Sequence, residues 1–495
     1  MLLGRFLSSA IRTSQLTKVS GMTINSTESS HSATTTAAQR LLAVQKRLVS
    51  SSPASKFSHT TIATHHHPVS NKGDGDAEVL THQHPSGICE ILLNRPKNLN
   101  AINYTMCDII CERLLTWEKS DACKAIFVRG NGGKAFCAGG DIKALLDLAQ
   151  EGRNDDITYI FNRQYRKDHL IGSIQKPYIA LIDGITMGGG VGLTMNGPFR
   201  IATENTVFAM PENSIGLFSD ASASFWMPRL DGSLGPYIGL TGKRLRGADV
   251  FYAGIATHYV PTKHLDSLES ALKELASQSQ GSLDQNAINA VIERFSADME
   301  QEAPFSLGGD IYPAINRCFN HETMEEIIAA LKNEKVAVDW AKETLDRLSG
   351  MSPTSMKISL QLYHTGARLS FIDCMRLEYQ LAGKCLAGSE FSEGTRATLV
   401  TRTKPNWNPP TLEEADANEI KRHYFDAPLD TSLTPLCEGG NYMEYPHTRY
   451  MLPKCSDILD MADKIGNKEN TVKYFLEKYN GKQGVRTKVM CVLKM

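Results

Sequence analysis

Two glycine-rich turns contain the residues of this sequence that are best suited to chemistry. One turn holds Gly139, Gly140 and Asp141, and the other, about fifty residues later, holds Gly188 and Gly189. Each follows an apolar stretch and precedes an expected helix, where glycine lets backbone N–H groups approach a ligand at the positive end of the helix dipole. Two N–H groups that converge on one oxygen would form an oxyanion hole, the group a thioester needs when its carbonyl oxygen gains charge.

Two carboxylates follow these turns. Glu212 comes after the stretch from Phe208 to Pro211, and Asp220 lies eight residues further on. An acid beside an apolar wall can have its pKa raised and can then act as a general base near neutral pH.

Each of these features also has a structural interpretation. Glycine clusters before helices serve tight packing or dinucleotide binding, although neither turn has the glycine spacing of the Rossmann fingerprint. A glutamate after proline is commonly a helix N-terminal residue or a surface residue. The residue types and their spacing therefore leave the role of each turn and of each acid open.

The elements that would position these residues alternate between strand and helix. This alternation predicts βαβ units, a mainly parallel sheet and an α/β fold. The expected strands are 88–94, 125–129 and 177–182, and the expected helices are 104–119, one that begins near Asp141, and 190–196.

Beyond about Leu265 the pattern is mostly helical. Apolar residues at helical spacing from Met324 to Leu331 predict one helix, and Ser352-Pro353 predicts the start of another. A last segment, 435–495, is aromatic and rich in lysine, with no obvious place in the α/β body. We therefore divide the folded part into a core at 78–265, a helical part at 266–434 and an extension at 435–495.

Residues 1–77 have a different composition. The first seventy residues carry seven Lys or Arg and a single acid, Glu28. This bias is typical of a mitochondrial transit peptide, so we predict a mitochondrial matrix protein. The alternative is a disordered tail without a targeting role.

The overall composition excludes little but sets expectations. A formal net charge of -1 gives no reason to expect nucleic acid or an anionic membrane as the main partner. The eleven cysteines lack a paired metal spacing, and no apolar run reaches eighteen residues. We expect no metal, no redox cofactor and no membrane partner.

Several longer motifs resemble the crotonase, or enoyl-CoA hydratase/isomerase, superfamily. They are KAFCAGGDI from Lys134, GITMGGGVGL from Gly184, FAMPENSIGLF from Phe208, and LTGKRLRGADVFYAGIATHYV from Leu240. The resemblance implies a ClpP/crotonase-like fold of repeated ββα units with a helical C-terminal region. SPTSMKISL from Ser352 and EYQLAGKCLAGSEFSEGTRATL from Glu378 are more closely similar to the 3-hydroxyisobutyryl-CoA hydrolase branch.

The resemblance also implies roles for individual residues. It implies that Gly140 and Gly189 supply the oxyanion-hole amides, that Glu212 is the active-site glutamate, and that Asp220 binds substrate. The implied reaction hydrolyses the thioester of 3-hydroxyisobutyryl-CoA in valine breakdown, with coenzyme A as part of the substrate and no cofactor. Hydratases carry a second glutamate where this chain has Gly192, which argues against hydration.

Further substrate-binding residues are predicted around these four. Lys97 is a candidate for the coenzyme A phosphates and equally suits a solvated surface position. The other predicted substrate-binding residues are Gly139, Asp141, Gln164 and Gly188.

Two departures from the family pattern bear on activity. Gln164 stands where the family usually has glutamate, and Ser222-Ala223-Ser224 stands where it has three glycines. Residues with a Cβ avoid positive φ, so we expect the loop that carries Asp220 to be repositioned.

A structural role is the alternative function. Crotonase-fold relatives of the hydrolase serve as proteins of the mitochondrial ribosome small subunit. In that case residues 1–77 and 435–495 would be arms that contact ribosomal proteins and rRNA.

Overall fold

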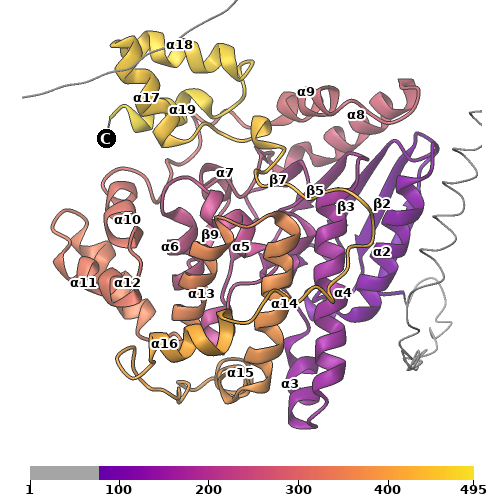
Figure 1. The fold of residues 1–495 in the computed structure, drawn as a ribbon. Helices are drawn as coiled ribbons and strands as arrows, with labels where there is room; N and C mark the ends of the chain where they lie inside the picture. Colours follow the sequence, from indigo (N-terminus) through magenta and orange to yellow (C-terminus); the bar gives the residue numbers. More distant parts are fainter. Residues whose placement is uncertain (1–76, 495) are drawn as a thin grey trace, which may run out of the picture. The chain divides into compact units, whose positions relative to one another are not determined.

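Two β-sheets carry the turns and the acids. The computed structural model describes residues 77–494, and within them one sheet has the strand order β1-β2-β3-β5-β7-β10 and the other β4-β6-β8-β9 (Figure 1). The first sheet contains β1 Val79–Gln83, β2 Ile88–Leu93, β3 Ala125–Gly130, β5 Tyr178–Ile182, β7 Phe199–Ala202 and β10 His258–Tyr259. The second contains β4 Ala135–Cys137, β6 Ile185–Met187, β8 Val207–Ala209 and β9 Leu245–Arg246.

The central strands of the first sheet are buried on both faces. Every residue of β5 and β7 is buried, and β2, β3, β5, β7 and β10 pair in parallel. A parallel sheet is covered by helices on both faces, so continuous apolar runs are the sequences expected there. The expected strands at 88–94, 125–129 and 177–182 are thus confirmed.

The second sheet positions the chemistry. Its strands β4, β6 and β8 pair in parallel, so their carboxyl ends lie at one edge. Gly139 follows β4, Gly188 follows β6, and Glu212 follows β8. Residues that are far apart in sequence therefore meet at this edge.

Long helices pack side by side against this core. Helix α4, Asn154–Ser173, contacts both α2, Tyr104–Glu118, and α14, Phe371–Ala387. Asn103 caps α2 by accepting from the Met106 N–H, which explains why the helix begins there. Figure 1 shows α2, α4 and α14 in neighbouring positions.

The region after Leu265 is helical, as predicted. The Met324 helix has a capping box in which Thr323 and Glu326 exchange hydrogen bonds, and Ser352 caps the helix that begins at Pro353. The helices are α8 Leu265–Gln278, α9 Gln285–Phe295, α10 Ile311–Phe319, α11 Met324–Asn333, α12 Val338–Leu348, α13 Pro353–Gly366, α15 Ser389–Thr395 and α16 Ala417–Ile420. Those of the core are α3 Ile142–Gln150, α5 Ala223–Trp226, α6 Leu234–Thr241 and α7 Ala248–Tyr252.

One expected helix differs. The sequence predicts an α-helix at 190–196, but the structure has a short 3₁₀ helix, η3, over Gly188–Leu193. Glycine has a low helix propensity, and tight 3₁₀ turns are made in short pieces. Gly190 also packs so closely on the backbone of Cys137 that no side chain would fit.

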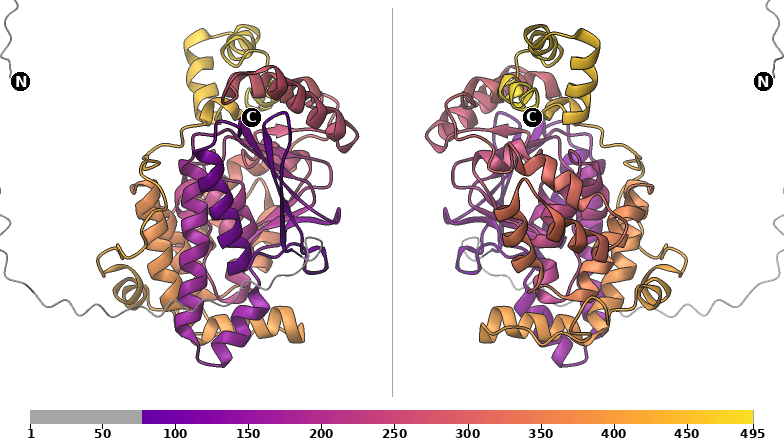
Figure 2. Two further views of the ribbon diagram at one scale, coloured as in Figure 1. Left: turned by 90° about the vertical axis from the view of Figure 1, so that its right-hand side faces the viewer. Right: turned by 90° about the vertical axis from the view of Figure 1, so that its left-hand side faces the viewer.

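The extension from Pro435, to which the sequence assigns no obvious place, packs on the α/β body. The Tyr442 ring stacks on Phe371 with 4.8 Å between centroids, and the Tyr445 hydroxyl donates to the Gly197 carbonyl over 2.6 Å. The extension then forms α17 Cys455–Ile465, α18 Lys468–Lys478 and α19 Val485–Val492, which lie at the same end as α8 and α9 (Figure 2). Aromatic anchors, which a sequence pattern does not assign to partners, explain this packing.

The predicted transit peptide and linker, 1–77, lie outside the described part of the chain except for residue 77. Within 77–494, no helix is both long enough and apolar enough to cross a membrane.

The stacking of Tyr442 gives a test of this packing. We expect Tyr442→Ala to lower the free energy of unfolding by about 2 kcal/mol, because a half-buried ring that stacks on Phe371 is lost. Tyr442→Phe is the matched control, since it keeps the ring and removes a buried hydroxyl that has no hydrogen-bond partner among the described residues. Urea titrations in which the alanine variant unfolds like the wild type would contradict the packing.

Candidate active site

The two glycine turns converge. A Cβ added at Gly189 would lie 3.2 Å from the Gly140 nitrogen. Gly139 and Gly188 both have positive φ, +120° and +49°, which glycine adopts without strain and which lets the turns approach each other.

The N–H groups of Gly140 and Gly189 are available to a ligand. In the described part of the chain the Gly140 N–H donates no hydrogen bond, and Gly189 is the second residue of η3. The first N–H groups of a helix have no acceptor within it. The two predicted oxyanion-hole donors therefore lie close together and have no acceptor among residues 77–494.

Glu212 lies against the second turn. It is the first residue of a 3₁₀ helix, η4 Glu212–Ile215, and its side chain is buried. Its Oε1 atom would be 2.7 Å from a Cβ at Gly188, so only glycine leaves room for the carboxylate there. Its Oε2 atom has no hydrogen-bond partner among residues 77–494. Burial, and then the charge of Asp220, raise the pKa of Glu212 well above its usual value.

Asp220 is buried and held by donors from α4. It accepts from the Tyr165 hydroxyl over 3.0 Å and from Gln164 Nε2 over 3.4 Å. Burial raises the pKa of Asp220 to about 7, although the Tyr165 hydrogen bond opposes the shift. The carboxylate thus titrates near neutral pH.

Gln164 connects Asp220 to the second turn. Its Nε2 atom lies 3.0 Å from where a Cβ at Gly189 would stand. A glutamine amide donates to a carboxylate, whereas an ionised glutamate at this position would only accept. The departure at 164 therefore adds a hydrogen bond to Asp220 and keeps a further charge out of the site.

The Asp168 carboxylate fills the space beside Gly192. A Cβ at Gly192 would come within 2.4 Å of Asp168 Oδ1. Asp168 forms a fully buried ion pair with Lys167, so it does not move aside cheaply. With Asp168 in this position, the chain has no room for a second glutamate at position 192.

Asp141 and Lys97, two of the predicted substrate-binding residues, lie in different surroundings. Asp141 caps α3 by accepting from Ala144 and forms a 2.9 Å ion pair with Arg95. Lys97 is exposed in a 3₁₀ helix, η2 Pro96–Asn98, and has no hydrogen bond or ion pair with the described residues. Their roles remain predictions.

The loop after Asp220 keeps a left-handed backbone despite its side chains. Ala221 has φ +56° and Ser222 has φ +65°. Each such residue costs about 1–2 kcal/mol relative to ordinary backbone. We expected residues with a Cβ to avoid positive φ in this loop, but Ala221 and Ser222 both adopt it.

Glu378, a residue that sequence analysis did not single out, holds this loop. Its carboxylate on α14 accepts from the N–H groups of Ser222 and Ser224, both over 2.9 Å, and from the Ser224 hydroxyl over 2.5 Å. Burial, and then the charge of Asp220, raise the pKa of Glu378 to about 8. No local signal in the sequence marked it, because α14 also carries Asp373, Arg376 and Lys384.

No group of three or more His, Cys, Asp or Glu residues within 77–494 is arranged to hold a metal ion.

The strained loop gives a matched pair of variants. Ala221 and Ala223 are both fully buried, but only Ala221 has positive φ. Ala→Gly removes a methyl group at either position, so the difference between the two isolates the backbone strain. We expect Ala223→Gly to lose about 1–2 kcal/mol more unfolding free energy than Ala221→Gly. Equal losses in chemical denaturation would show that residue 221 is not strained.

Comparisons with known proteins agree on the family. Residues 88–425 match the Enoyl-CoA hydratase/isomerase family model. The chain is 41% identical over 418 residues to the small ribosomal subunit protein mS47 of Neurospora crassa. This alignment covers 81% of this chain and 82% of that protein. The chain is 40% identical over 372 residues to the mitochondrial 3-hydroxyisobutyryl-CoA hydrolase of Homo sapiens. This alignment covers 74% of this chain and 94% of that protein.

A solved structure shows the same fold. The carnitinyl-CoA dehydratase of Mycobacterium thermoresistibile superposes with a TM-score of 0.64 at 31% identity, covering 73% of this chain and all of that one. The predicted crotonase-like fold and the predicted resemblance to 3-hydroxyisobutyryl-CoA hydrolases are both confirmed. The chain belongs to the enoyl-CoA hydratase/isomerase family.

Proposed function

We propose that this chain hydrolyses an acyl-CoA thioester, with 3-hydroxyisobutyryl-CoA as the substrate. The observation that carries the proposal is the position of Glu212. Its carboxylate is buried, has an oxygen without a partner in the described structure, and lies against a turn whose N–H groups are free. A basic carboxylate next to an oxyanion hole is the arrangement that acyl transfer to water requires.

The substrate carbonyl oxygen would accept hydrogen bonds from Gly140 and Gly189. Glu212 would take a proton from water as it attacks, or would itself attack and form a mixed anhydride that water then opens. In either route the C–S bond breaks, the sulfur leaves as the thiolate of coenzyme A and gains a proton, and the acyl group becomes a carboxylic acid. Asp220 would orient the substrate hydroxyl or the water, and Gln164 would hold Asp220.

Hydrolysis is favoured over hydration of a double bond. Hydration requires two carboxylates, and the Asp168 side chain occupies the space in which one from position 192 would lie. The reaction needs no cofactor beyond the coenzyme A of the substrate. The hydrolase relatives are named as mitochondrial proteins, and with the basic composition of residues 1–77 this supports the mitochondrial matrix as the location.

The test is thiol release from 3-hydroxyisobutyryl-CoA by the purified full chain. We expect Glu212→Gln to lower kcat at least about a hundredfold, because an amide can neither accept the proton nor attack. Glu419→Gln, at an exposed glutamate on α16, should leave the rate unchanged. The rate should rise with pH as Glu212 ionises, at higher pH than for an exposed glutamate, since its pKa is raised.

A Glu212→Gln variant that keeps wild-type turnover would exclude this mechanism. A well-folded wild type with no turnover would exclude the hydrolase function itself.

The second candidate is a structural role in the mitochondrial ribosome. It is favoured by the alignment to the mS47 protein, which spans 418 residues, against 372 for the human hydrolase at similar identity. Reduced or absent activity would accompany that role.

Sedimentation distinguishes the two functions. For the hydrolase, we expect the protein to remain near the top of a sucrose gradient of mitochondrial lysate, together with the thiol-releasing activity. Stoichiometric migration with the small ribosomal subunit, resistant to about 0.3 M salt that screens exposed charge contacts, would instead support the structural role.

A further inference from the structure

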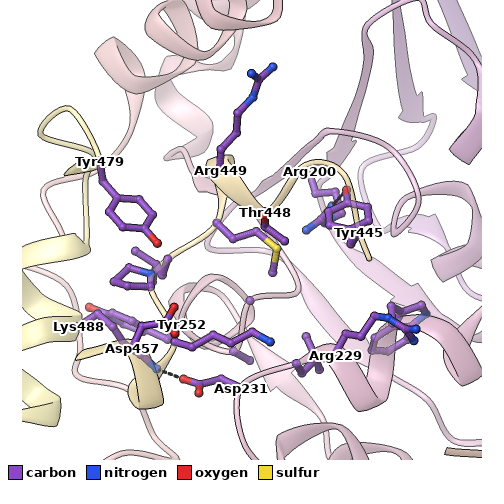
Figure 3. A pocket seen from close by; sticks show the side chains of 18 of the residues that line it. Arg200, Arg229, Asp231, Tyr252, Tyr445, Thr448, Arg449, Asp457, Tyr479 and Lys488 are labelled. Carbon is purple, nitrogen blue, oxygen red and sulfur yellow. Dashed lines mark hydrogen bonds and ion pairs between the residues drawn. The ribbon is translucent and has the colours of Figure 1, made fainter. Parts of the chain in front are cut away.

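A second cavity lies where the extension meets the α/β body. Its volume is about 520 Å³, within the range of sites that hold small molecules. One wall comes from the body and the other from residues 444–488, as Figure 3 shows. None of Gly140, Gly189, Glu212 or Asp220 lines it, so it is separate from the candidate active site.

Arg200 is a buried cation in this wall without a counter-ion. Its side chain is 1% exposed, and its hydrogen bonds go to neutral acceptors, namely backbone carbonyls and the Tyr445 hydroxyl. No acidic side chain within 77–494 forms an ion pair with it, and its Nη2 atom has no hydrogen-bond partner there. A buried charge without a counter-ion is only partly compensated by hydrogen bonds to neutral acceptors, so an anion that faced Arg200 would be stabilised.

Arg229 is a second cation in the same wall, but it is half-buried and all three of its guanidinium nitrogens donate to backbone carbonyls. Its guanidinium donates to the carbonyls of Phe225 and Met443, over 2.7 and 2.8 Å, and lies 3.9 Å from the centre of the Phe225 ring. It has no acidic partner at ion-pair distance in the described chain. Nearby, burial lowers the pKa of His447 to about 4, and the charges of Arg200 and Arg449 add to the shift.

The charges that line the cavity are unbalanced. Six cations line it against three acids, and one of those acids, Asp231, is already paired with Lys488 over 2.8 Å. The other two acids are Glu444 and Asp457. The walls therefore carry an excess of positive charge.

An aromatic residue lies on the opposite side. Figure 3 shows Tyr479 across the cavity from Arg200 and Tyr445. The rings of Trp226 and Tyr252 also line the cavity. The walls thus offer cationic donors at one side and apolar ring surface at the other.

We propose that this cavity binds a nucleotide, with its phosphates toward Arg200 and its base against Tyr479. The Nη2 atom of Arg200 can donate to phosphate oxygens, and an aromatic ring can stack on any of the bases. The inference does not rest on the proposed hydrolase function.

Calorimetric titration of the full chain with ADP at low salt tests the site. We expect binding by the wild type and at least a tenfold loss of affinity in Lys454→Glu/Lys478→Glu, which reverses two exposed charges of the lining. The matched control is Lys464→Glu/Lys468→Glu, with the same change of net charge on exposed residues of α17 and α18 that do not line the cavity. It should bind within about twofold of the wild type.

A second arm tests the aromatic side. We expect pyrophosphate to bind more weakly than ADP, and Tyr479→Leu to weaken ADP while leaving pyrophosphate unchanged. Neither readout depends on thioester hydrolysis, so an inactive protein would still give an answer.

Three results would overturn the proposal. One is the absence of ADP binding by the wild type. Another is an equal loss of ADP affinity in both double-lysine variants, which would indicate general charge attraction. The third is ADP binding that is unchanged in Lys454→Glu/Lys478→Glu, which would place the nucleotide in the thioester site or elsewhere.

Discussion

The hydrogen bonds from the Ser222–Ser224 loop to Glu378 are the constraint on which the candidate site depends. They fix two side-chain-bearing residues, Ala221 and Ser222, in left-handed backbone directly after Asp220. Glycine would adopt this backbone freely, but here the conformation must be held by external contacts. The loop serines contribute to those contacts, because the Ser224 hydroxyl donates to Glu378 and the Ser222 hydroxyl donates to Asn196. The departure from glycine is therefore compensated within the same loop.

Holding the loop this way gathers three carboxyl groups in one buried region. Burial raises the pKa of Glu212, of Asp220 to about 7 and of Glu378 to about 8. The folded state then holds these protons more tightly than the unfolded chain, in which the values are near 4. Stability consequently falls as pH rises from about 4 toward 8, whereas a base at Glu212 needs the ionised form. The site is thus most reactive under the conditions in which it is least stabilised, as is common for buried catalytic acids.

Local sequence patterns were sufficient to predict the strands and the glycine turns, but not the contacts between residues that are far apart in the sequence. The strands, the glycine turns and the place of Glu212 after a strand follow from runs of neighbouring residues, and the structure has them there. The contacts of Glu378 with Ser222, of Asp168 with Gly192 and of Tyr442 with Phe371 join residues that no periodicity relates. They depend on how helices pack across the sheet, so a single sequence contains no local signal for them. The same holds for the cavity, whose walls come from two segments far apart in the sequence, 195–254 and 444–488.

Gln164 affects both the number of buried acids and the hydrogen bonds of Asp220. An ionised glutamate there would add a fourth acid to a region in which like charges already raise the pKa of each neighbour. It would also withdraw a donor from Asp220, whose remaining hydrogen bond from another side chain comes from Tyr165. Glutamine keeps the shape, donates to Asp220 and leaves Glu212 as the acid beside the free N–H groups. A chain that fixes its Asp220 loop with one buried carboxylate, Glu378, therefore has a physical reason to carry an uncharged residue at position 164.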